Sequence, residues 1–165
     1  MKYRVYKMKF NTAVHFGNGM LNESDFIFKS DSLFSALYIE SIKLNCHEQF
    51  YKCIEEGRVS FSDLLPYIED RYYIPKPNLY IDTNNLNKGD SIEKKKIKKI
   101  KYIPVDKIDS FLNGVYESDE EKFGEKITMS KAFVRTKEDT EPYHVGTFKF
   151  YDNAGLYWLI KTKKI

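Results

Sequence analysis

The sequence has few of the residues that mark a specialised class of protein. Of its 165 residues, 2 are cysteine, 5 are proline, 8 are glycine and 1 is tryptophan. So little cysteine excludes a disulfide scaffold, and a hydrophobic content of 42% excludes a disordered chain. No apolar run approaches the roughly 20 residues that cross a bilayer. The sequence therefore predicts one cytoplasmic globular domain over residues 1–165, without a membrane segment.

Charge is nearly balanced, whereas aromatic residues are abundant. The formal net charge is +3, with 13 Tyr and 12 Phe. Tyrosine lies beside lysine or arginine at several points, including Tyr3, Tyr51 and Tyr102. Interleaved aromatic and cationic side chains suit stacked bases and phosphates. The alternative, which the composition alone favours, is that these tyrosines lie half-buried on sheet faces.

The order of elements predicts an α+β fold. Residues 3–10 alternate as a half-buried strand whose outer face carries Lys7 and Lys9. Further elements are expected as helices at 32–45, 47–56 and 105–112, and as strands at 72–74, 79–81, 129–135, 144–150 and 156–161, with a turn at 152–155 between the last two. We interpret this as a ferredoxin-like (RRM-like) βαββαβ domain with insertions. Residues 65–67 are expected in a loop.

Two further segments have competing interpretations. Cys46 and Cys53, on one apolar face with Phe50, are expected to be reduced and buried. The lysine-rich run at 93–101 is equally compatible with a solvated helix face and with a nucleic-acid contact.

The loop after the first strand contains His15 and Gly17. His15 could bind a phosphate or act as a general acid or base, and Gly17 allows close approach to a ligand. From spacing alone, a structural role in bracing the loop is favoured for His15. The glycines do not form a nucleotide-binding fingerprint.

The start of the first helix contains Ser30, Asp31 and Ser32. Backbone N–H groups at a helix start can bind a phosphate. Capping of the helix by Ser30 or Asp31 is the simpler use of these side chains.

A late cationic hairpin is the most distinctive polar cluster. It contains Arg135 and Lys137 at its tip, followed by Tyr143 and His144. Such a tip could grip a nucleic-acid backbone and stack a base, although an ordinary hairpin loop has the same composition. No catalytic triad, carboxylate pair or metal-ligand cluster has convincing spacing, so we expect binding rather than catalysis, with neither metal nor cofactor.

Several segments taken together resemble one family. These are the segments at 14–19, 30–37, 73–77, 101–105 and 134–146. They are similar to the Csm-type RAMP subunit that caps the 5′ end of the guide RNA in type III-A CRISPR effector complexes, which act in antiviral defence.

The resemblance implies a ferredoxin-like RAMP domain, the N-terminal half of a longer protein, that binds the repeat-derived 5′ handle of crRNA. RNA contacts would then fall at His15, Gly17, Ser30, Ser32, Arg135, Lys137, Tyr143 and His144. The implied partners are crRNA, the large polymerase-like, cyclase-bearing subunit and the backbone-forming RAMP subunit.

Two other functions compete with this hypothesis. One is a metal-independent RAMP endoribonuclease that processes repeat RNA with His15 as general acid or base. The other is a protein-interaction module whose aromatic surface docks a partner.

Overall fold

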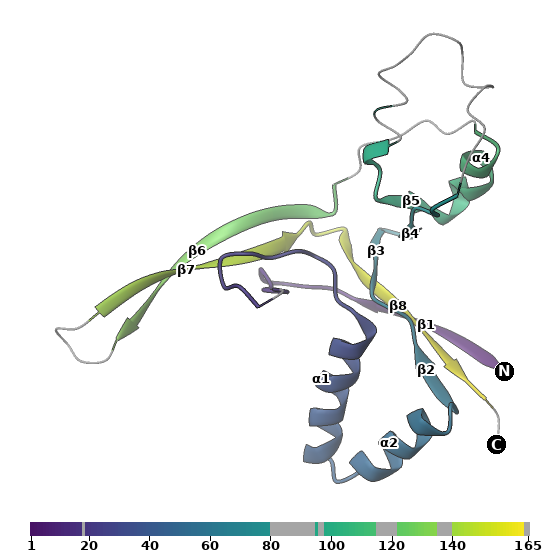
Figure 1. The fold of residues 1–165 in the computed structure, drawn as a ribbon, viewed down its shortest axis with the longest axis horizontal. Coiled ribbons are helices and arrows are strands. Elements are labelled where there is room, and N and C mark those ends of the chain that lie inside the picture. Colours follow the sequence, from purple (N-terminus) through teal and green to yellow (C-terminus); the bar gives the residue numbers. More distant parts are fainter. Residues whose placement is uncertain (18, 80–94, 96–97, 115–121, 135–139, 164–165) are drawn as a thin grey trace.

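The computed structural model describes residues 1–17, 19–79, 95, 98–114, 122–134 and 140–163. Within these ranges the chain forms two antiparallel sheets with helices packed on one of them (Figure 1). The larger sheet has the order β1-β8-β3-β4-β5, with β2 also paired to β8. The smaller sheet is a two-stranded arm, β6-β7. The larger sheet contains β1 (Lys2–Met8), β2 (Val59–Phe61), β3 (Leu65–Ile68), β4 (Arg71–Pro75), β5 (Tyr102–Pro104) and β8 (Ala154–Thr162), and the arm contains β6 (Gly124–Val134) and β7 (Thr140–Phe150).

Strand β8 is the centre of the larger sheet. Along one side it pairs with β1 over its length, from Met8 opposite Leu156 to Lys2 opposite Thr162. Along the other side β3 pairs with its first half and β2 with its second half. A strand with neighbours on both sides is expected to be rich in apolar residues. Leu156 accordingly has an exposed fraction of 0%.

The main core lies between the larger sheet, α1 and the base of the arm. Leu156 packs there with Leu33 of α1, Leu64, and the aromatic rings of Tyr73, Phe123, Phe148 and Phe150. A second, smaller cluster joins Ile103 to Phe111 of α4. Aromatic rings supply much of this core, which explains why the sequence contains so many of them.

The helices are α1 (Ser30–Lys43), α2 (His47–Glu55), a 3-10 turn η2 (Val105–Lys107) and α4 (Ile108–Leu112). The predicted helices at 32–45, 47–56 and 105–112 are therefore confirmed to within two residues. At the end of α2, Gly57 has a φ of 61° and Arg58 N–H donates to the Cys53 carbonyl. This is the Schellman geometry that a glycine after a helix favours.

The first strand differs from its prediction. Apart from Met8, every residue of β1 is exposed, because β1 is an edge strand. Lys7 is exposed but engaged by neighbouring residues. Its Nζ atom lies 5.0 Å from the centroid of the Tyr67 ring and 2.9 Å from Asp70 Oδ1. The predicted strand and the exposure of Lys7 and Lys9 are therefore confirmed, whereas the expected half-burial of the strand is wrong.

The predicted closing strands at 144–150 and 156–161 are confirmed as β7 and β8. Residues 152–153 turn the chain, but β7 and β8 do not pair with each other, because β7 pairs with β6 and β8 enters the larger sheet. The predicted strand at 72–74 is confirmed as β4, which pairs with β5. Most of the predicted strand at 79–81 lies outside the described residues. Residues 65–68 form β3, not a loop. The proline made this short apolar run resemble a loop in sequence. Pro66 has no backbone N–H, but it can occupy a strand position at which no N–H donor is needed.

The mixed α and β architecture with antiparallel sheets agrees with the predicted fold class. The free thiols agree with the prediction of reduced cysteines, but Cys46 is exposed and Cys53 is only half-buried. Much of the lysine run lies outside the described residues. None of the described helices is long and apolar enough to span a membrane.

The centre of the sheet provides a test of the core. We expect Leu156→Ala to lower the free energy of unfolding by about 2–5 kcal/mol, because it opens a cavity at a fully buried site. Leu159→Ala, on the same strand but 37% exposed, is the control and should cost less than about 1 kcal/mol. Urea unfolding measures both values. Equal losses would contradict a core that lies on one face of β8.

A buried tyrosine predicts an alkaline limit to stability. Tyr157 is 4% exposed, its hydroxyl donates to the Tyr73 carbonyl at 3.0 Å, and burial raises its pKa to about 12. Between the ordinary value of about 10 and this value, the unfolded chain loses the proton and the folded chain keeps it. Stability should therefore fall as the pH rises from 10 to 12. Tyr157→Phe should show a shallower fall in urea unfolding across this range, and an identical slope would contradict the assignment.

Candidate nucleic-acid interface

The segment after β1 is hydrogen-bonded along the outer edge of β7. Val14 N–H donates to the Phe148 carbonyl at 2.9 Å, and Phe148 N–H donates back to the Val14 carbonyl at 2.7 Å. Two residues along β7, Gly146 N–H donates to the Leu21 carbonyl at 2.7 Å. These bonds fix the loop that carries His15 at the base of the arm.

His15 is part of this attachment. Its Nδ1 atom lies 2.6 Å from the Gly146 carbonyl. A carbonyl only accepts, so Nδ1 must carry the proton and donate. The Nε2 atom lies on the side of Gly17, where a Cβ would stand only 2.6 Å away. His15 therefore makes the kind of bracing contact that its spacing favoured. A side chain at position 17 would collide with the His15 ring, which explains the glycine there.

Gly146 is the point of closest approach between loop and arm. A Cβ at this position would lie 2.4 Å from the Asn22 carbonyl oxygen, which is a backbone atom and cannot turn away. Any larger residue must therefore push the loop off the edge of β7. Attachment of the loop to β7 therefore requires glycine at position 146.

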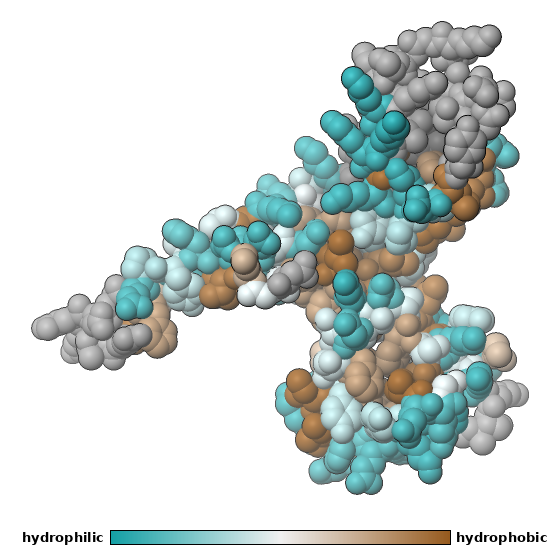
Figure 2. Space-filling view, viewed as in Figure 1, coloured by the Kyte–Doolittle hydropathy of each residue, from teal (hydrophilic) through white to brown (hydrophobic). Residues whose placement is uncertain are grey.

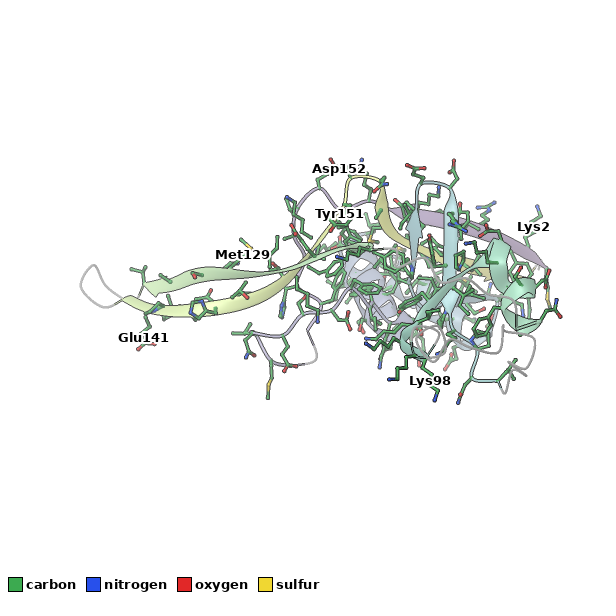
Figure 3. The ribbon with its side chains drawn as sticks, turned by 90° about the horizontal axis from the view of Figure 1, so that it is seen from above. Lys2, Lys98, Met129, Glu141, Tyr151 and Asp152 are labelled. Carbon is green, nitrogen blue, oxygen red and sulfur yellow. The ribbon has the colours of Figure 1, made fainter. Side chains whose placement is uncertain are left out.

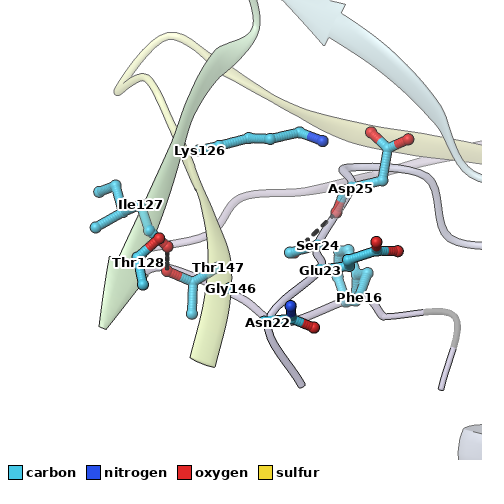
Figure 4. A pocket seen from close by; sticks show the side chains of 10 residues that line it. All are labelled: Phe16, Asn22, Glu23, Ser24, Asp25, Lys126, Ile127, Thr128, Gly146 and Thr147. Carbon is cyan, nitrogen blue, oxygen red and sulfur yellow. Dashed lines mark hydrogen bonds between the residues drawn. The ribbon is translucent and has the colours of Figure 1, made fainter. Parts of the chain in front are cut away.

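A groove of about 460 Å³ runs between the loop and the base of the arm (Figure 4). The loop side of the lining includes Glu23 and Asp25, and the arm side includes Lys126. The complete lining is Phe16, Asn22, Glu23, Ser24, Asp25, Lys126, Ile127, Thr128, Gly146 and Thr147. In Figure 4, Lys126 reaches from β6 toward the part of the loop that carries Asp25.

Asp25 also acts on the core side of the loop. Its Oδ1 atom accepts the Phe26 N–H at 2.8 Å. Burial first, and then the negative charges of Asp25 and Asp63, raise the pKa of Tyr102. Asp25 therefore has a structural role in the loop. Glu23 is exposed and does not share this role.

The arm carries the other predicted contacts away from the body. Seen from above, β6 and β7 form a thin ribbon with Met129 and Glu141 along it (Figure 3). Across this ribbon, Ser130 Oγ and His144 Nδ1 lie 3.2 Å apart. Tyr143 is 37% exposed, so part of its ring is accessible to a ligand. Hydrophilic and apolar residues alternate along the arm (Figure 2). The predicted tip residues Arg135 and Lys137 lie outside the described residues.

Ser30 and Ser32 stand apart from this junction. Ser30 N–H donates to Asp63 Oδ1 at 2.8 Å, and Ser32 N–H donates to Asp31 Oδ1 at 2.7 Å. The predicted side-chain cap from Ser30 or Asp31 is wrong in its detail, because the helix begins at Ser30 and Asp63 supplies the acceptor from a distant segment. Among the described residues, no hydrogen bond joins either serine to His15 or to the arm.

Sequence reasoning missed the groove and its charged residues. Lys126 and Glu23 are about a hundred positions apart and match no motif, so only the pairing of the loop with β7 brings them together. Among the residues that the structure describes, no group of three or more His, Cys, Asp or Glu side chains could hold a metal ion.

Comparisons with known proteins identify the relatives of the chain. It is 32% identical to the CRISPR system protein Csm4 of Mycobacterium tuberculosis (strain CDC 1551 / Oshkosh) over 168 residues, which covers 98% of the chain and 54% of the relative. It is 28% identical to Csm4 of Streptococcus thermophilus over 163 residues, covering 95% of the chain and 52% of the relative. Both relatives are Csm4 proteins, and the similarity extends over nearly the whole of this chain. It spans about half the length of these curated relatives. No protein-family model matches it.

Solved structures support the same fold. A chain in the crystal structure of a Csm1-Csm4 cassette in complex with cA4 matches with a TM-score of 0.66 at 19% identity, covering 98% of this chain and 59% of that one. A chain in a Csm3-Csm4 subcomplex of the type III-A CRISPR-Cas interference complex matches with a TM-score of 0.57 at 24% identity, covering 98% and 58%. At these identities the likeness concerns the fold.

The attachment of the loop can be tested at Gly146. We expect Gly146→Ala to lower the free energy of unfolding by about 1–3 kcal/mol, because the added methyl group meets a backbone carbonyl. The freed loop should also be cut faster by trypsin after Lys9 and Lys29, which flank it. Thr128→Ala, opposite Gly146 on β6, is the control and should change neither value appreciably. An unchanged cleavage rate in Gly146→Ala would show that the loop does not depend on this contact.

Proposed function

We propose that this chain binds the repeat-derived 5′ handle of crRNA as a non-catalytic subunit of a type III-A CRISPR effector complex. The observation that carries the proposal is the hydrogen bond from His15 to the Gly146 carbonyl. It joins the loop expected to contact RNA to the strand that carries Tyr143 and His144. Similarity to Csm4 proteins over 98% of the chain supports the assignment to this kind of complex.

The proposed binding combines phosphate contacts with stacking. The partly exposed ring of Tyr143 offers a stacking surface on the arm, and stacking tolerates any base. Arg135 and Lys137, which follow β6 directly in the sequence, supply cations for the phosphates. A narrow arm that projects from the body lets an extended strand lie along both arm and loop.

We also infer that the larger sheet is ferredoxin-like. β1 and β3 lie on opposite sides of β8 and both run antiparallel to it, so β1 and β3 are parallel to each other. The connection between them contains α1 and α2, which gives a β-α-β crossover followed by an antiparallel strand. This arrangement supports the ferredoxin-like βαββαβ topology, with β4, β5 and the arm as insertions before β8.

The proposed protein partners are the large polymerase-like subunit and the backbone-forming RAMP subunit. The solved complexes that contain similar chains are named as Csm1-Csm4 and Csm3-Csm4 assemblies, which supports both. The chain has exposed apolar residues for such contacts. Val5 and Leu159 lie opposite each other in the register, on the sheet face away from the main core, and are 50% and 37% exposed.

The geometry favours binding over RNA cleavage. A general acid or base needs a partner that orients it and a free nitrogen that reaches the reacting group. The bond from Nδ1 to the Gly146 carbonyl orients the His15 ring and leaves Nε2 as the free nitrogen, but no described acidic or basic side chain is hydrogen-bonded to the ring as a second catalytic group. The endoribonuclease is therefore the second candidate, favoured only by the presence of His15 in the loop.

The proposal predicts salt-sensitive binding of intact RNA. We expect the chain to retain a labelled crRNA that carries its 5′ handle, in the absence of divalent metal. The logarithm of the affinity should fall linearly with the logarithm of the salt concentration. Arg135→Ala should weaken binding and reduce the slope by about 1, because one phosphate contact is lost. Lys52→Ala, on the exposed side of α2, is the control and should leave the slope unchanged.

The same reactions distinguish the alternatives. RNA that is cut without metal, with cutting lost in His15→Ala, would establish the endoribonuclease instead. Absence of RNA binding at low salt, together with partner binding that resists nuclease treatment, would favour the protein-interaction module.

A further inference from the structure

We propose that the outer edge of β1 binds an extended segment of another polypeptide chain, one in which acidic and apolar residues alternate. β1 is an edge strand of the larger sheet. It begins at Lys2, which lies at the end of the molecule opposite the arm (Figure 3). Binding at this edge is therefore separate from the proposed binding of RNA and does not depend on it.

The direction of the backbone groups on this edge follows from the pairing of β8. Leu159 uses both of its backbone groups on the side away from β1: its N–H donates to Ser62 Oγ at 2.9 Å, and its carbonyl accepts the Ser62 N–H at 3.0 Å. Val5 lies opposite Leu159, so the two residues share no hydrogen bond and the N–H and carbonyl of Val5 point outward. The direction alternates along a strand, so Tyr3 and Lys7 have the same orientation.

β1 lacks most of the features that protect a sheet edge from an added strand. Such features are a short strand, a bulge, a proline, or charged side chains. The register of β1 with β8 is continuous over seven residues, and none of them is proline. The opposite edge differs, because β5 has three residues and ends at Pro104. Among the described residues, no hydrogen bond reaches the outward backbone groups of β1. Charge is thus the one protective feature present.

The charge of β1 favours an acidic partner over a second copy of the chain. Lys2 and Arg4 are exposed, and within the described ranges neither has an ion-pair partner. Lys7 differs, because its Nζ atom already pairs with Asp70. β1 contains no acidic residue, so a second β1 would add only cations to this edge. Carboxylates beside Lys2 and Arg4 would instead form opposite-charge pairs across the strands.

The two faces of β1 differ, which predicts the alternation in the partner. Lys2 and Arg4 share one face, because successive side chains of a strand point to opposite faces. Tyr3 and Val5 lie on the other face and are 64% and 50% exposed, beside Leu159. A strand added about 4.8 Å away places its own side chains alternately over these two faces. Acidic residues on one face and apolar residues on the other therefore match β1 on both.

A strand of RNA fits this edge less well than a peptide does. Its phosphates accept hydrogen bonds from N–H groups but donate none, so they would leave the outward carbonyls of β1 unpaired. A peptide backbone supplies donors and acceptors in turn, at the same two-residue spacing as β1, and strand addition of this kind derives its affinity from main-chain hydrogen bonds.

The test measures the affinity of the 165-residue chain for a synthetic peptide of seven residues, the length of β1, in which glutamate alternates with valine. We expect binding at low salt. Lysine in place of glutamate should weaken it by at least about tenfold, because the peptide then repels Lys2 and Arg4. Two further peptides carry N-methyl groups on the glutamate amides only or on the valine amides only. One of these two sets faces β1, so one peptide should lose binding and the other should keep it.

Variants of the chain test the same edge from the other side. Val5→Pro removes an outward donor and no bond to β8, and it should weaken peptide binding by about tenfold. Val5→Ile keeps the N–H and is its control. Arg4→Gln should weaken binding about twofold to fivefold, the effect of one exposed ion pair. Lys52→Gln, which changes the net charge equally on α2, should leave binding unchanged.

Amide hydrogen exchange locates the bound peptide. The peptide should slow exchange at the N–H groups of Tyr3, Val5 and Lys7. It should change Arg4 and Tyr6 little, because their N–H groups already face β8. Urea unfolding of Val5→Pro shows that the variant is folded. The N-methylated peptides provide the same test without changing the protein.

Several outcomes would overturn the assignment. These are absence of peptide binding at low salt, equal binding of the lysine peptide, and equal binding of both N-methylated peptides. A dimer in sedimentation equilibrium that Val5→Pro abolishes would assign the edge to a second copy of the chain. An oligouridylate that displaces the peptide and binds less tightly to Arg4→Gln would assign it to RNA. RNA binding that continues when the peptide saturates the chain would support two separate surfaces.

Discussion

The pairing of β8 with three other strands is the constraint on which the rest of the molecule depends. β8 is the last strand in the chain, yet it lies between β1 on one side and β2 and β3 on the other. The segments at the two ends of the described chain are thus side by side in the sheet. Everything between β5 and β8 must leave the sheet and return to it. The arm is the part of this excursion that projects furthest, and its position is fixed because β7 leads directly into β8 through a short turn.

A second set of bonds attaches the loop after β1 to the arm. Because Phe148 and Gly146 use their outward-facing backbone groups on Val14 and Leu21, the outer edge of β7 is covered at its base. An uncovered edge can pair with other chains, so this cover also protects the arm. The contact works only if no side chain intervenes at Gly146 and Gly17. The loop, the groove and the base of the arm therefore form one unit, which a single added methyl group can disturb.

The sequence predicted the positions of helices and strands better than it predicted which strands pair. Helix α2 was predictable because its end is marked by Gly57, and a glycine signal of this kind depends only on local backbone geometry. The pairing of β8 could not be predicted. Alternation in residues 156–161 shows that a strand exists, but it does not show which strands flank it. The groove could not be predicted for the same reason. Lys126 and Glu23 line one groove only because of long-range pairing, and neither residue type is unusual in its own segment. His15 could be singled out beforehand, because histidines are few and a glycine-containing loop is distinctive.

The distribution of charge bears on the RNA recognition that we propose. The first turn of α1, an obvious place for a phosphate, already meets the carboxylates of Asp63 and Asp31. The groove wall adds Glu23 and Asp25. In the proposed RNA complex, negative charge in both places would direct the phosphates of a bound strand toward the cations of the arm, because charge repulsion is strong where water is partly excluded. Carboxylates near an RNA interface thus need not weaken it. In the proposed complex they would keep phosphates away from these positions, so that the phosphate contacts fall on the arm.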